Sequence, residues 1–258
     1  MKTNTLLRTL GVFALILTAC LRAQTPATDD RTTALAEARS GNWVRAESVL
    51  APLAAAEPID VEICVLLAQR YLGQKRNKEA VELMERVVAA QPDQAGLHSL
   101  LGQALSQRIG ELAFMQQAFV APKMLRAFKR SVELDAHHVP GLIGLANYYL
   151  YSPAIAGGSL EKAEEYALQV EKLDAFNGAL VRAQIRERQE KWSEAAECLR
   201  KALAAQPANA WLQARLGGVL AKAGQPAEAK AAFAAALKLQ PDQPEALAGL
   251  QALAAPKS

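Results

Sequence analysis

A proline that recurs at a fixed interval is the feature of this sequence that most restricts its fold. Pro58 and Pro92 are separated by the same length of chain as Pro207 and Pro241. The segment from Pro92 to Pro207 is three such intervals long with a small surplus. A fixed period of this length indicates an array of supersecondary units, each of which packs on its neighbours in sequence.

Small and large apolar residues recur at helical spacing within each period. In the second half of a period, a small residue is followed four positions later by a larger apolar one: Ala46/Leu50, Ala80/Met84, Ala195/Leu199 and Ala229/Phe233. The first half places an apolar and a small residue side by side: Leu67-Ala68, Leu101-Gly102, Leu145-Ala146 and Leu216-Gly217. Small residues at such positions let two helices pack closely while larger side chains fill the groove beside them. Each period therefore predicts a pair of helices.

The composition favours a fold built from helices alone. Apolar residues make up 51% of the chain and aromatic residues 5%, and much of the apolar share is alanine, which suits close-packed helices. No apolar/polar alternation is long enough to predict a strand. Gly41 and Gly224 follow two expected first helices, where a left-handed cap conformation favours glycine. We therefore expect an all-α fold.

This pattern resembles the tetratricopeptide repeat family, whose consensus has Leu-Gly and an aromatic residue in the first helix, Ala and an aromatic residue in the second, and then Pro. The resemblance covers residues 27–253 and is closest in 210–241, followed by 61–92. It implies a right-handed superhelix (an α-solenoid) of about six helix pairs plus a C-terminal cap helix. The expected units are 27–60, 61–94, 95–138, 139–177, 178–209 and 210–243, followed by a cap helix at 244–253 and a tail at 254–258.

Three of the expected units depart from the regular length. The third has about ten extra residues between its helices, from near Ser106 to Pro122, and we expect Pro122 to begin the following helix. The fourth has about five extra residues, Ser152–Ser159, and the fifth is two residues short at its start, which together account for the surplus between Pro92 and Pro207. The fifth unit fits least well, because its first helix, expected at 180–190, is charged and has Arg182 where Leu is usual.

The first residues predict export. Lys2 and Arg8 precede an apolar stretch, Leu10–Ala19, that is short for a permanent membrane span. One processing route removes residues 1–23 as an ordinary signal peptide, which leaves a periplasmic or secreted protein.

A lipoprotein signal is the second processing route. Leu17-Thr18-Ala19-Cys20 resembles a lipobox, in which residues 1–19 are removed and Cys20 is lipidated. That route anchors a periplasmic protein to the outer membrane through its lipid, and we expect no other membrane contact. The residues after Cys20 are unusual for a lipoprotein, so both routes stay open.

Removal of residues 1–23 changes the charge of the chain from +3 to 0, because this segment holds three basic residues and no acidic one. A neutral chain lacks the clustered cations that nucleic-acid binding requires. We therefore expect a protein or peptide partner and no nucleic acid, with an oligomeric state that the sequence leaves open.

The sequence has no credible catalytic set. We find no glycine-rich phosphate loop after a strand, no metal-type Cys/His spacing and no nucleophile elbow, so we expect no enzyme, cofactor or metal site. His137 and His138, with acidic residues nearby, fall where the third unit turns into the fourth and are best interpreted as part of a solvated turn. Cys64 and Cys198 occur at core spacing and are expected to be buried thiols.

The resemblance also implies a binding surface, because tetratricopeptide arrays bind partners in a concave groove lined by first helices. The helical register places six side chains near this groove: Gln69, Gln103, Asn147, Tyr151, Gln184 and Trp211. The Lys/Asn/Arg clamp that some family members use for C-terminal carboxylates is not reproduced, since Asn147 alone matches it. An amide-rich, nearly neutral groove suits an extended peptide held by hydrogen bonds to its backbone. Any one of the six could equally be an ordinary exposed side chain.

The extra residues of the fourth unit offer a second candidate site. Gly157 and Gly158 can adopt backbone angles closed to other residues, and Ser159 suits the N-cap of the following helix. The simpler interpretation is an elongated, capped loop. The alternative is an anion or carboxylate site at the helix N-terminus, helped by Lys162, which would make the protein a small-molecule or anion sensor. The loop's Pro-x-Ile-Ala-Gly-Gly-Ser stretch resembles one shared by a set of exported bacterial tetratricopeptide proteins, and implies a subfamily rather than an activity.

The extra residues of the third unit carry an apolar stripe at helical spacing: Ile109, Leu112, Met115, Phe119 and Val120, with Phe114 off it. We expect the stripe to fold back onto the helices, and the alternative is that it lines a partner surface or gates the groove. The sequence as a whole predicts a non-catalytic scaffold of the bacterial periplasm or envelope, with the sensor as the second hypothesis.

Overall fold

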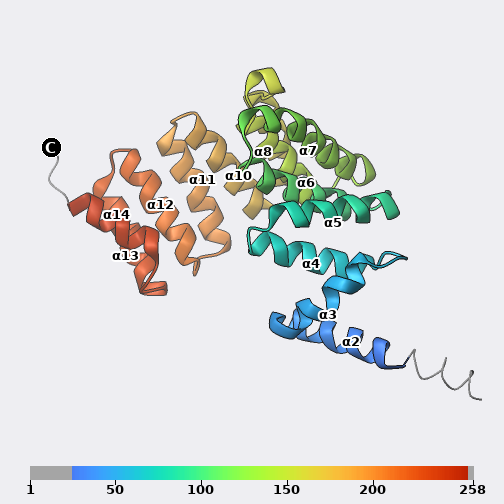
Figure 1. Ribbon diagram of the computed structural model, residues 1–258. Helices are drawn as coiled ribbons and strands as arrows, with labels where there is room; N and C mark the ends of the chain where they lie inside the picture. The colour runs from blue at the N-terminus through green and yellow to red at the C-terminus, as the bar shows by residue number, and fades with distance from the viewer. Residues whose placement is uncertain (1–24, 255–258) are drawn as a thin grey trace, which may run out of the picture. The chain divides into compact units, whose positions relative to one another are not determined.

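Residues 25–254, the part of the chain that the computed structural model describes, fold into thirteen α-helices and one short 3-10 helix, η1 (Figure 1). The first helices of the pairs are α2 (Thr25–Arg39), α4 (Val61–Gly73), α6 (Ala95–Ile109), α8 (Val139–Tyr151), α10 (Ala175–Arg188) and α12 (Ala210–Lys222). The second helices are α3 (Trp43–Ala55), α5 (Asn77–Ala90), α7 (Phe114–Leu134), α9 (Leu160–Leu173), α11 (Trp192–Ala205) and α13 (Pro226–Leu239). The 3-10 helix η1 (Ala154–Ala156) follows α8, and α14 (Pro244–Ala254) comes last. The predicted all-α fold of helix pairs is confirmed.

The helices pack in the order of the chain within two compact units, and the chain passes from one to the other between Pro92 and Asp93. In the first unit, α2 packs on α3, α3 on α4, and α4 on α5 (Figure 1). In the second unit, α6 to α14 do the same, and α8 also contacts the neighbouring first helices α6 and α10. None of the helices described between residues 25 and 254 has the length and apolarity to span a bilayer. The predicted signal segments and Cys20 lie outside the described residues.

Glycines in the first helices make room for aromatic side chains of the second helices. Phe128 of α7 lies between Gly102 of α6 and Gly144 of α8, and a Cβ atom on either glycine would collide with its ring. Phe233 of α13 is likewise enclosed by glycines of α12 and α14. The small residues of the second helices are fully buried, as Ala80 and Ala195 illustrate with 0% exposure. The close packing predicted from small residues is therefore how these pairs are built.

Capping residues explain several helix ends. The side chains of Asp60, Ser159, Asp174 and Asn209 each accept a hydrogen bond from the backbone N–H three residues later, at the start of α4, α9, α10 and α12. Gly41 and Gly224, with φ of 87° and 74°, follow α2 and α12 in the left-handed conformation that was predicted for them.

The third unit differs from its prediction at Pro122, which does not begin a helix. Helix α7 starts at Phe114 and runs through Pro122 to Leu134 without a break, so most of the extra residues extend the second helix. Pro122 has no N–H to donate to the carbonyl four residues earlier, and the turns that follow it bury Met124, Ala127 and Phe128. The extension inherits the register of α7, whose buried residues include Ala121, Met124 and Phe128.

This inherited register also corrects the expected apolar stripe. The face that buries Ala121 and Met124 continues back to Gln117 and Phe114, at intervals of three and four residues. Met115 and Phe119 therefore point away from the helices and are 72% and 76% exposed. The interpretation that the stripe folds back onto the array is wrong for these two residues, whereas Ile109, Leu112 and Val120 are half-buried. Phe114, on the face that continues to Ala121, is itself 74% exposed.

The charged residues of the fifth pair form ion pairs beside the apolar residues that α10 buries. Helix α10 begins at Ala175, earlier than expected. Asp174 is both the C-cap residue of α9 and the N-cap residue of α10. Arg182 bonds Glu171 at 2.9 Å and Glu164 at 3.3 Å, and Arg186 bonds Glu164 at 3.0 Å. These side chains are 15–28% exposed. The cations that fit the repeat poorly thus tie α10 to α9.

Replacing Glu164 with Gln should lower the free energy of unfolding by about 1–3 kcal/mol, between the values for exposed and buried ion pairs. Both arginines would lose a charged partner while remaining largely shielded from water. Urea unfolding followed by circular dichroism measures the loss. The matched control is Glu82→Gln, since Glu82 faces Lys78 at 3.8 Å on an exposed surface and should change stability by at most about 0.5 kcal/mol. Equal losses in the two variants would contradict the role given to Glu164.

Candidate functional site

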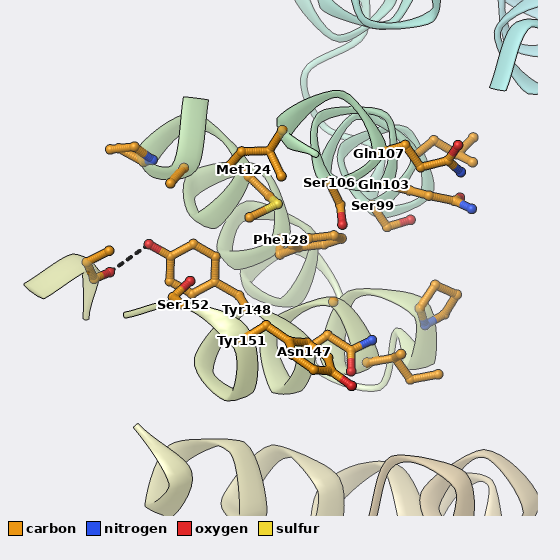
Figure 2. A pocket seen from close by; sticks show the side chains of 18 of the residues that line it. Ser99, Gln103, Ser106, Gln107, Met124, Phe128, Asn147, Tyr148, Tyr151 and Ser152 are labelled. Carbon is orange, nitrogen blue, oxygen red and sulfur yellow. Dashed lines mark hydrogen bonds between the residues drawn. The ribbon is translucent and has the colours of Figure 1, made fainter. Parts of the chain in front are cut away.

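A pocket of about 1420 Å³ opens between α6, α7 and α8 in the second unit (Figure 2). Phe128 and Met124 of α7, which are 5% and 7% exposed, present part of their surface to it. Helix α6 contributes Ser99 and Gln103 on one side, and α8 contributes Asn147 on the other. Glycines bring α6 and α8 close to Phe128, and the pocket lies beside its ring.

The two insertions of the sequence meet at this pocket. The extension of α7 lines it with Phe114, Gln117 and Ala118, and the segment after α8 lines it with Pro153 and Ile155. Phe114 is 74% exposed and Ile155 96% exposed, although both are large apolar residues. The sequence marks both insertions but gives no sign that they lie together, because they are separated by the whole of α8 and most of α7.

The segment after α8 is held in a defined shape. The hydroxyl of Tyr148 donates a hydrogen bond of 2.8 Å to the carbonyl of Ala156 (Figure 2). Gly157 has a φ of 87°, and Gly158 lies against the carbonyl of Ser152 where a Cβ atom would not fit. Both glycines are therefore required by the fold of the loop, which presents Ile155 at the pocket.

The three loop residues named for the candidate anion site have their N–H groups occupied. The N–H of Gly157 donates to Ala154 at 2.9 Å, and the N–H of Gly158 to Pro153 at 3.0 Å. The N–H of Ser159 donates to Tyr149 at 2.9 Å.

The two side chains named for that site are also engaged. The hydroxyl of Ser159 accepts the N–H of Lys162 at 3.2 Å, as an N-cap. The ammonium of Lys162 lies over the ring of Tyr149, 5.2 Å from its centroid. This geometry favours the interpretation as a capped loop.

The six predicted groove residues fall into three groups. Gln103, Asn147 and Tyr151 line the pocket together (Figure 2). Gln184 of α10 and Trp211 of α12 belong to the same unit but lie outside the pocket lining. Trp211 is 48% exposed, and the guanidinium of Arg215 lies 5.5 Å from the centre of its ring. Gln69 is an exposed residue of α4 in the first unit.

Amides and hydroxyls supply the polar groups of the pocket. The side-chain oxygen of Asn147 is buried and has no hydrogen-bonding partner within residues 25–254, whereas Gln103 and Gln107 are more open to solvent. Partial burial raises the pKa of the Tyr151 phenol, so the hydroxyl stays protonated at neutral pH. These groups can donate and accept hydrogen bonds without carrying charge.

The sequence analysis missed one polar contact in the pocket. His138, expected in a solvated turn, is half-buried, and its Nε2 atom lies 2.9 Å from the Ser99 hydroxyl. Ser99 also donates to the carbonyl of Gly96 at 2.9 Å, and Asp135 lies 4.0 Å from the other ring nitrogen. These contacts fasten the turn before α8 to α6. Ser99 lies on α6 and His138 is the N-cap residue of α8, so their distance in the sequence gives no hint of this contact.

The two cysteines of the described chain are buried and free, as predicted. Burial raises the pKa of both Cys64 and Cys198 and so disfavours their reactive thiolate forms. Within residues 25–254, no group of three His, Cys, Asp or Glu side chains is placed to hold a metal ion.

Comparisons with known proteins agree with the helix pairs. The family model described as Tetratricopeptide repeat matches residues 37–104 and 188–254. The segment between these ranges holds both insertions and most of the pocket lining. A comparison with curated protein sequences gives no match.

Solved structures with the same fold share little sequence with this chain. TTC0263, a tetratricopeptide protein of Thermus thermophilus, has a TM-score of 0.62 at 19% identity, over 75% of this chain and 98% of that one. PilW, a type IV pilus biogenesis factor, has a TM-score of 0.66 at 14% identity, over 88% and 99%. A tetratricopeptide repeat protein from Parabacteroides merdae ATCC 43184 has a TM-score of 0.61 at 13% identity, over 88% and 91%. At these identities the similarity concerns the fold alone.

Proposed function

The chain belongs to the tetratricopeptide repeat family, and we propose that it is a non-catalytic scaffold of the bacterial periplasm or envelope that binds a partner protein at the pocket of its second unit. Proteins of this family generally bind protein partners, and they are typically not enzymes. Beyond these family properties, the proposal specifies the binding site and the cellular compartment.

One observation carries the place of binding. Three of the side chains that the family resemblance assigns to a groove, Gln103, Asn147 and Tyr151, converge on a single pocket, and both insertions extend its walls. Regular repeats need neither insertion to fold. A chain that keeps two irregular segments on one open, apolar pocket has the features expected of a partner-binding site.

Photocrosslinking in cells tests this place. A photoreactive phenylalanine analogue at Tyr151, which is 60% exposed in the pocket, should yield a specific protein adduct that mass spectrometry identifies. The same analogue at Val44, which is 93% exposed on α3, serves as the matched control. Adducts at Val44 but not at Tyr151, or no adduct at either position, would count against binding at the pocket.

The compartment is supported by the basic start and short apolar stretch of residues 1–19. Mass analysis of the protein purified from cells gives its mature N-terminus. A start at Gln24 supports the ordinary signal peptide, and a lipidated Cys20 supports the outer-membrane anchor. A chain that keeps residues 1–19 in the cytoplasmic fraction would refute export.

A further inference from the structure

We propose that the pocket takes an uncharged, extended segment of a partner polypeptide, with a large apolar side chain inserted beside Phe128. This inference rests on the proposed function, because it specifies which part of a partner the scaffold would bind. The charge, the apolar surface, the amides and the size of the pocket each bear on it.

The pocket lining holds few ionisable side chains, and its one histidine, His138, is engaged by the Ser99 hydroxyl at 2.9 Å. Its lining residues, all between 94 and 177, include no Asp, Glu, Lys or Arg, although such residues make up 21% of the chain. Arg108, which adjoins two lining residues of α6, is paired with Glu111 at 2.7 Å. A charged group that entered this space would lose water and find no Asp, Glu, Lys or Arg side chain in the lining to pair with. The pocket therefore selects against a C-terminal carboxylate, a phosphate or a charged side chain.

The interior suits a large apolar side chain. Met124 and Phe128 from α7 and Ile143 from α8 present apolar surface to the same space. At its edge, Phe114 and Ile155 leave most of their side-chain surface exposed. An apolar side chain that entered between them would remove surface of both partners from water, which is the main source of binding free energy at such sites.

The amides indicate an extended backbone rather than a helical one. Each of Gln103, Gln107 and Asn147 offers both donors and an acceptor, and the buried oxygen of Asn147 has no partner in the described chain. An extended segment carries free N–H and C=O groups along its length, whereas a helix satisfies its own. Side-chain amides beside an apolar pocket are thus matched to an extended peptide.

The size of the pocket favours a peptide over a small molecule. Its volume of about 1420 Å³ exceeds the range of about 300–1,000 Å³ that is typical of small-molecule sites. A segment of several residues fills such a space, with one side chain in the interior and the neighbouring backbone against the amides.

Peptide selection on the full chain tests the inference. Phage-displayed random peptides are selected on the protein, and the enriched sequences are remade and measured by fluorescence anisotropy. We expect a core without Asp, Glu, Lys or Arg that contains Leu, Ile, Met or Phe. Gln103→Glu, which places a carboxylate in the lining, should weaken binding at least about tenfold. Phe114→Ser, which removes apolar surface at the edge of the pocket, should also weaken binding.

Gln69→Glu is the matched control, because Gln69 holds the equivalent exposed position one period earlier and lies outside the pocket. It should change the affinity by less than about twofold. Enrichment of charged peptides, or equal losses from Gln103→Glu and Gln69→Glu, would overturn the inference. If no peptide is enriched while the analogue at Tyr151 still captures a protein, the inference falls and the proposed function stands. If that crosslink is also absent, both fall.

Discussion

Replacing Gly144 with Ala should destabilise the second unit by about 2 kcal/mol, because overpacking of a filled core typically costs about 1–3 kcal/mol. The new methyl group would overlap ring atoms of Phe128, and the same ring also lies against Gly102. The higher helix propensity of alanine returns at most about 1 kcal/mol of the loss. Because neither α6 nor α8 can move without breaking contacts to Phe128, we expect a clear net loss. Urea unfolding of the purified variant measures it.

A second glycine provides a control of opposite sign. Gly218 in α12 has no atom within 4 Å of the position where a Cβ would lie. Gly218→Ala should therefore stabilise the protein by about 0.5–1 kcal/mol through helix propensity alone. Adding Phe128→Leu to Gly144→Ala should recover part of the lost stability, since the shorter side chain frees the space. Destabilisation by Gly218→Ala equal to that of Gly144→Ala would show that the packing around Phe128 is not the cause.

The sequence is sufficient for the helix pairs because the residues that build them repeat. Gly102 and Phe128 recur as Gly217 and Phe233, and the same contact forms in both places. A repeated contact leaves a repeated pattern, which is why the regular spacing of small and large apolar residues predicts the fold. The ion pairs of the fifth helix pair do not repeat along the chain. Arg182, which stands where the repeat usually has Leu, therefore could not be explained from the pattern.

The insertions show where prediction from the sequence ends. Pro122 was expected to start a helix, since proline is common in the first turn, but α7 already begins at Phe114 and continues through Pro122. That continuity decides that Phe114, rather than Phe119, faces the pocket. Two features depend on tertiary packing: the contact of Ser99 with His138, and the position of both insertions at one pocket. No local pattern in the sequence predicts either of them.

The individual groove residues illustrate the same limit. Gln103 and Asn147 were placed by helical register, and they do line one pocket with Tyr151. Gln184 and Trp211 follow the same register but lie outside the lining of that pocket. A register fixes which face of a helix a residue occupies, while the spacing between helices and the insertions determine where a pocket forms.

Phe233→Ala should cost about 3–5 kcal/mol, the largest loss that we predict for a single side chain. Phe233 is 2% exposed and fills the space between Gly217 of α12 and Gly249 of α14. Neither glycine has a side chain that could move into the cavity. Since helices of such arrays depend mainly on their neighbours, the loss should be concentrated in α12 to α14. Hydrogen exchange measured by mass spectrometry locates it.

Phe119→Ala is the matched control for this loss, because it removes the same side chain from a position that is 76% exposed. It should change stability by no more than about 0.5 kcal/mol. Faster exchange spread evenly over residues 93–254 in Phe233→Ala would mean that the second unit unfolds as one block, and that its repeats are coupled more strongly than contacts between neighbours require. Faster exchange confined to the last three helices would mean that the end of the array can open while the pocket between α6 and α8 stays intact. In that case Phe233→Ala should bind the selected peptides as the unaltered protein does, because stability at the end of the array and binding at the pocket depend on different contacts.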